Sequence, residues 1–128
     1  MRLAQLAALP AIAIMSSTAN AQAPATVEVH LSNFKFAPQA IAFRRGQPYV
    51  LRLVNDSGGG HDFTAKEFFA TAAIAQRDRA WVRDGEVEVP GGETREIHLT
   101  ASKAGTYKLK CSHTFHKAFG MSGRIVVR

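Results

Sequence analysis

Apolar and polar residues alternate in short segments along most of the chain, and turn residues separate these segments. Val27, Val29 and Leu31 alternate with polar neighbours, which is the period of a strand with one buried face. The same alternation recurs around Ile41 and Phe43, Tyr49 to Leu53, Val87 and Val89, Ile97 and Leu99, Tyr107 to Cys111, and Ile125 to Val127. Seven or eight short strands at this spacing predict an all-β fold, an antiparallel β-sandwich.

Two details refine this prediction. Phe34 and Phe36 keep the alternation of the first strand, so we expect that strand to continue until Pro38. The segment from Lys66 to Gln76 is rich in Ala and repeats its apolar residues at helical spacing, which predicts one short helix. We expect its two phenylalanines to pack on the sandwich. His30 and His98 occupy the polar positions of their strand patterns, so we expect both to be exposed on the surface.

The first 21 residues have the pattern of a signal peptide. A positive start at Arg2 precedes an apolar run from Leu3 to Met15, and Ala19-Asn20-Ala21 forms a small-x-small cleavage site. A membrane anchor is the alternative interpretation, but the apolar run is shorter than the roughly 20 residues needed to span a bilayer. We therefore expect cleavage after Ala21, export to the periplasm, and a single domain over residues 22–128 with no membrane span.

The net charge and the single cysteine limit the kinds of ligand that this protein is expected to bind. The formal net charge is +6 and falls to +5 when Arg2 is removed. The basic residues are scattered rather than gathered in one run, so nothing in the sequence indicates nucleic-acid binding. An exported protein meets oxidising conditions, in which cysteines normally pair, yet Cys111 is the only cysteine. A single thiol there is buried, bonded to a partner, or held by a metal.

A set of metal-binding residue types surrounds that cysteine. His113 and His116 follow Cys111, and Met121 comes five residues after His116. His61 follows a glycine-rich loop some fifty residues earlier. Thiolate and thioether suit Cu(I) and imidazole suits Cu(II), so this mixture favours one copper ion that changes oxidation state. Zinc sites seldom use thioether, and iron–sulfur clusters need more thiolates than the chain has.

The chain resembles the cupredoxins, the plastocyanin/azurin family of exported blue-copper proteins, from Val27 to Val127. The segments Gly105-Thr106-Tyr107-Lys108-Leu109-Lys110-Cys111 and Gly120-Met121-Ser122-Gly123-Arg124-Ile125-Val126-Val127 carry the most specific part of the resemblance. It implies a Greek-key β-sandwich with copper held by two histidines, one cysteine and an axial methionine.

Matched residue by residue, the resemblance implies that His61, Cys111, His116 and Met121 are the copper ligands. His116 keeps the family's separation from Met121 and is favoured over His113, which is left as a neighbouring group, an exposed residue or a transient ligand during copper loading. Asp62 stands where the family commonly has asparagine. Its carboxylate is expected to accept a hydrogen bond from the opposite ligand loop, for instance from Ser112.

The function that follows is transfer of single electrons, because that is the family's usual role. The alternative is a periplasmic copper carrier or buffer that delivers copper to another protein, which the extra imidazole of His113 favours. Catalysis is not expected, since the single candidate copper leaves no second site for a substrate. The expected partner is therefore a redox protein or a copper-accepting protein, and the chain is expected to be a monomer.

Overall fold

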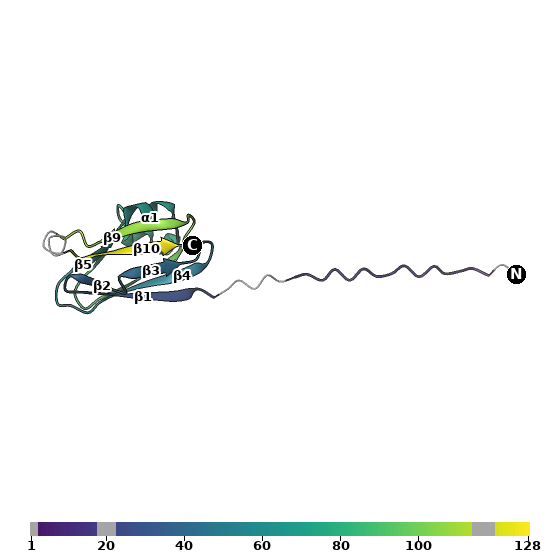
Figure 1. Cartoon of the computed structure of the whole chain (residues 1–128). Helices are drawn as coiled ribbons and strands as arrows, with labels where there is room; N and C mark the ends of the chain where they lie inside the picture. Colours follow the sequence, from purple (N-terminus) through teal and green to yellow (C-terminus); the bar gives the residue numbers. More distant parts are fainter. Residues whose placement is uncertain (1–2, 18–22, 114–119) are drawn as a thin grey trace.

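Two five-stranded sheets pack face to face in a computed structural model that describes residues 3–17, 23–113 and 120–128 (Figure 1). The first sheet has the order β2 (Lys35–Ala37), β1 (Ala25–Ser32), β4 (Pro48–Asn55), β8 (Thr94–Thr100) and β6 (Ala73–Ile74). The second has the order β3 (Ala40–Phe43), β10 (Ser122–Val127), β9 (Gly105–Lys110), β5 (His61–Thr64) and β7 (Glu86–Val89). This confirms the predicted all-β sandwich.

Most neighbouring strands run antiparallel, but two pairs run parallel. β1 pairs with β4 so that Val29 lies opposite Leu53, and β10 pairs with β3 so that Ile125 lies opposite Ile41. Both parallel pairs join strands that are distant in the chain. They arise because the chain crosses between the sheets, with β2 in the first and β3 in the second. A period-2 pattern identifies the buried face of a strand but not the direction of its neighbour.

The core lies between the sheets and is formed by the inward positions that the alternation predicted. Leu31, Leu51 and Ile97 from the first sheet and Leu109 and Ile125 from the second are essentially inaccessible to solvent. Aromatic contacts join the two layers. Phe43 meets Tyr49 edge to face with 4.9 Å between the ring centroids, within the range in which such pairs add stability.

The segment from Lys66 to Gln76 departs from its prediction as one helix. The helix α1 covers only Lys66–Thr71, because the backbone turns extended at Ala72. Ala73 and Ile74 then form β6 and pair with β8, and a 3₁₀ helix, η1, follows at Gln76–Trp81. Ala73 and Ile74 thus pair with the edge of β8 instead of continuing the helix that the spacing of the apolar residues predicted.

The phenylalanines of α1 pack as expected. Phe68 and Phe69 are buried, and Phe68 stacks on Phe43 with 5.3 Å between the ring centroids. α1 lies beside β9 (Figure 1), and its side that carries Phe68 and Phe69 packs against the second sheet.

Two predictions about single residues were wrong in part, one about strand extent and one about exposure. Phe34 does not extend the first strand: it adopts a positive φ of 63° in a turn that folds β2 back on β1, and it is exposed. His98 is only half-exposed, since its backbone N–H and its Nδ1 both lie within 2.9 Å of the Asp78 carboxylate. η1 brings Asp78 over β8, which the strand pattern of His98 could not reveal. His30 has an exposed side chain, as predicted.

Residues 3–17 form neither helix nor strand and extend away from the sandwich (Figure 1). Among the helices in the described ranges, none combines the length and apolar character needed to cross a membrane. The expected cleavage after Ala21 falls outside the described residues, so the boundary between residues 1–21 and 22–128 stays a prediction.

Candidate metal centre

Cys111 and Met121 lie beside each other at one end of the second sheet. Cys111 directly follows β9 and Met121 directly precedes β10, and these strands pair antiparallel. The backbone N–H of Cys111 donates to the Met121 carbonyl at 3.1 Å, which extends the ladder by one step beyond the strands. Both side chains are buried. Antiparallel pairing therefore brings together a thiol and a thioether that are ten positions apart.

His61 enters the same region from the neighbouring strand. It is the first residue of β5, which lies between β9 and β7, and it is buried. The next residue, Asp62, donates its backbone N–H to the Cys111 sulfur at 3.5 Å. This contact fixes the sulfur against the start of β5. Three of the four predicted ligands, His61, Cys111 and Met121, thus come from adjoining strand ends.

Asn55 holds the loop before His61, a role that the sequence analysis missed. This buried amide donates to the carbonyl oxygens of Gly59 at 2.9 Å and Val89 at 2.8 Å. Its side-chain oxygen accepts from the backbone N–H and the hydroxyl of Ser57. An asparagine that ends a strand before a glycine-rich loop is a common turn-forming residue, and this was the available signal. The loop is therefore tied to both β4 and β7.

The Asp62 carboxylate connects the start of β5 to the residues after Cys111. Its Oδ1 accepts from the Ser112 backbone N–H at 2.8 Å and from the Thr64 hydroxyl at 2.7 Å, and its Oδ2 accepts from the Ser112 hydroxyl. Asp62 is fully buried, so these hydrogen bonds satisfy a charge that is costly to bury alone. The expected bond from Ser112 to Asp62 is confirmed.

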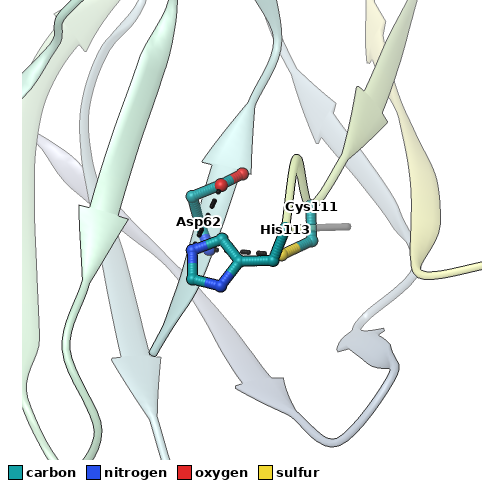
Figure 2. Close-up of side chains that lie close together, drawn as sticks. All are labelled: Asp62, Cys111 and His113. Atoms are coloured by element: carbon teal, nitrogen blue, oxygen red, sulfur yellow. Dashed lines mark hydrogen bonds and ion pairs between the residues drawn. The ribbon is translucent and has the colours of Figure 1, made fainter. Parts of the chain in front are cut away.

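His113 faces a group of carboxylates. Its Nε2 lies 3.0 Å from Glu88 Oε1 and 3.6 Å from Asp62 Oδ2, and its side chain is about one-third exposed. Figure 2 shows the imidazole beside the Asp62 carboxylate and close to the Cys111 sulfur. One ligand atom from each of Asp62, Cys111 and His113 lies within 4.8 Å of the others. These three residues could hold a metal ion, a set that the sequence analysis did not propose.

Burial has the largest effect on the pKa of the Cys111 thiol. Loss of solvent raises the pKa of Cys111, and the negative charges of Asp62 and Glu88 act in the same direction. Backbone N–H groups of Asp62 and His113 oppose this shift because they stabilise a thiolate. The group therefore keeps its proton at neutral pH until a cation replaces it. Two amide donors already point at the sulfur, as a thiolate ligand requires.

The residues that are described fit a copper ion by their chemistry. A thiol, an imidazole and a thioether are all buried at neighbouring strand ends, and Phe63, two residues after His61, is fully buried. Phe63 packs edge to face on Phe36 of the first sheet, with 5.9 Å between the ring centroids. The predicted fourth ligand, His116, lies outside the described residues. The preference for His116 over His113 therefore stays a prediction.

Comparisons with known proteins give the family. The family model for the cupredoxin-like domain matches residues 5–127. The copper-resistant cuproprotein CopI of Rubrivivax gelatinosus is 34% identical over 116 residues, which cover 84% of this chain and 69% of that protein.

Solved structures agree on the fold. Reduced auracyanin from Roseiflexus castenholzii superposes with a TM-score of 0.62 at 19% identity, over 84% of this chain and 99% of the auracyanin. Auracyanin A, a blue copper protein from Chloroflexus aurantiacus, superposes with a TM-score of 0.60 at 21% identity, over 83% and 100%. With the donor set at the ends of β5, β9 and β10, these matches show that the chain belongs to the cupredoxin-like family and is a copper-binding protein.

Proposed function

We propose that this protein carries single electrons through one copper ion held by His61, Cys111, His116 and Met121. Copper, when bound there, supplies one-electron chemistry by cycling between Cu(I) and Cu(II). The observation that carries the proposal is the Cys111 sulfur, which is buried, lies within a hydrogen bond of the Asp62 amide, and belongs to a residue tied to Met121.

The protein's contribution is to hold the ligands in place while charge changes. The Asp62 carboxylate fixes the residue after Cys111, and the Asn55 amide fixes the loop before His61. Ligands that cannot rearrange keep the cost of gaining or losing an electron low. Phe63, two residues after His61, is a fully buried apolar side chain, and we expect it to limit water near the site, which supports the same role. We assign no catalytic reaction to this site, and export to the periplasm remains part of the proposal.

The test is electrochemical. The copper-loaded protein is cycled on an electrode, and its copper content is measured before and after. The proposal predicts a reversible one-electron wave with copper retained in both states. Cys111→Ser should abolish the intense thiolate-to-copper absorption, and His116→Ala should perturb the spectrum more than His113→Ala. An irreversible wave with loss of copper on reduction would refute electron transfer.

A second function, copper buffering or delivery, is favoured by two observations. The relative CopI is named a copper-resistant cuproprotein, and His113 with Asp62 adds donors within 4.8 Å of the Cys111 ligand atom. Additional donors beside a bound ion assist ligand exchange. The test adds a Cu(I) chelator to the reduced protein and follows transfer. Rapid release that slows in His113→Ala would support delivery, whereas retention over hours would favour the electron carrier.

A further inference from the structure

Basic residues that are far apart in the sequence gather on the outer face of the second sheet. Lys108 and Lys110 are exposed on β9, Arg124 is exposed on β10, and Lys66 begins α1 beside them. A hollow is lined by Lys66, Lys108 and Lys110 together with Thr64 and the one acidic residue Glu67. We call the four cations Lys66, Lys108, Lys110 and Arg124 the basic face.

The basic face works against the stability of the sheet. Lys108 and Arg124 lie directly opposite each other across β9 and β10, and side chains in that position are about 5 Å apart at Cβ. Like charges so placed are destabilising. Within the described ranges, none of the four cations has a carboxylate within 4.0 Å, whereas Arg52 and Arg95 elsewhere do. An anionic partner would relieve this repulsion.

The basic face leads directly to the metal centre. Lys110 is the residue before Cys111. At about 3.3 Å per residue, Lys108 lies about 10 Å from Cys111 along the strand. Lys110 also lies opposite Thr64 of β5, two residues from Asp62, which contacts the sulfur. A molecule bound to the basic face is thus one strand segment from the thiol.

A strip of opposite charge adjoins this surface and would orient what binds. Glu86 and Glu88 project from β7, on the other side of β5 from the basic face. Their carboxylates lie within hydrogen-bond distance of Ser112 and His113, and within the described ranges neither carboxylate has a lysine or arginine side-chain nitrogen within 4.0 Å. A partner with an acidic patch is attracted by β9 and β10 and repelled by β7. This arrangement selects one orientation as well as one sign of charge.

We propose that the basic face is the docking surface for an acidic protein that exchanges electrons with the copper centre through the β9 end of the sheet. The proposal rests on the proposed electron-carrier function and names the partner class for that same site. Electrostatic steering of this kind raises association rates and weakens as salt is added.

The experiment measures the bimolecular rate of electron transfer between the copper-loaded protein and an acidic c-type cytochrome, by stopped flow at several ionic strengths. The Lys108→Glu/Lys110→Glu variant is compared with an Arg44→Glu/Arg45→Glu control, which makes the same change in net charge. The control arginines line a hollow with Arg128 where β3 and β10 end, about 20 Å along β10 from Met121. The lowest ionic strength used is 0.1 M, at which the Debye length of about 10 Å screens that distance.

The basic face variant should lose at least about tenfold in rate at low salt and converge with the wild type at high salt. The control should change far less. Equal losses in both variants would overturn the proposal, because only net charge would then matter. A variant rate equal to the wild type would also overturn it.

A second measurement separates failure of this proposal from failure of the proposed function. If no variant exchanges electrons with the cytochrome, the protein as isolated is titrated with hexacyanochromate(III), and broadening of backbone amide signals is mapped by NMR. Broadening centred on residues 66, 108, 110 and 124 supports the docking surface, and broadening elsewhere overturns it. Binding to phosphatidylglycerol vesicles is measured by co-sedimentation. If the basic face variant no longer binds the vesicles but keeps the wild-type rate with the cytochrome, the proposal is overturned in favour of a membrane surface.

Discussion

Replacing Asp62 tests whether one buried carboxylate fixes the loop that carries the thiol. In Asp62→Ala, the buried Thr64 hydroxyl and the Ser112 backbone N–H lose their acceptor, and the Ser112 hydroxyl keeps only Glu86 at 3.3 Å. A hydrogen bond to a charged group contributes about 1.5–3 kcal/mol, and a buried donor left without a partner costs about 1–3 kcal/mol. Ser112 is exposed, so water replaces most of its loss. The free energy of unfolding should therefore fall by about 2–4 kcal/mol.

The assay is unfolding of the metal-free protein, followed by circular dichroism in urea and on heating. For a domain of this size, 1 kcal/mol corresponds to about 4 °C, so Tm should fall by about 8–16 °C. Asp62→Asn is the matched control, because its side-chain oxygen still accepts from Ser112, and its loss should be about half as large. A value for Asp62→Ala within about 0.5 kcal/mol of the wild type would refute the reasoning, since that is the range of neutral surface changes.

Two further substitutions and one reactivity measurement have defined outcomes. Asn55→Ala should lower the free energy of unfolding, measured in urea, by about 2–4 kcal/mol. The reason is that the buried Val89 carbonyl and the Gly59 carbonyl in the loop before His61 both lose the Asn55 side-chain donor. An unchanged urea midpoint would contradict this. Carboxylates of Asp56 and Glu28 raise the pKa of His30, so its stabilising effect is full below about pH 6.5 and is lost as pH rises through the raised pKa. The difference in free energy of unfolding between the wild type and His30→Gln, measured in urea, should therefore shrink from pH 5.5 to pH 8.5. It should stay under about 1 kcal/mol because the pair is exposed. Burial of Cys111 and its raised pKa should make the metal-free thiol react far more slowly with an aromatic disulfide reagent than the urea-unfolded thiol, and equal rates would count against a buried sulfur.

The sequence predicted the parts of this structure that depend on local pattern. Period-2 alternation located the inward residues of β1, β4, β8 and β9, because burying one face of a strand leaves that signal. The resemblance implied that Cys111 and Met121 belong to one site, and the two residues do lie beside each other where β9 ends and β10 begins. The bond from Ser112 to Asp62 was also predictable, since a carboxylate in place of an amide keeps an acceptor.

Other features depend on contacts between distant segments and left no local signal. Phe34 has a strand-like pattern but folds into a turn, because β2 pairs back on β1. Ala73 and Ile74 pair with β8 although their spacing is helical. The residues of the basic face are separated by up to 58 positions in the sequence. Along the chain, the same residues look scattered. Strand neighbours and register are needed to predict such features.

The measurement that tests the central claim most directly is a visible absorption and electron paramagnetic resonance spectrum, recorded after adding Cu(II) to the protein and removing the excess. The account predicts an intense thiolate-to-copper band that a reductant bleaches and an oxidant restores, and that Cys111→Ser abolishes. A protein that stays colourless, or that retains only Cu(I), would contradict the Cys111-ligated electron-transfer site.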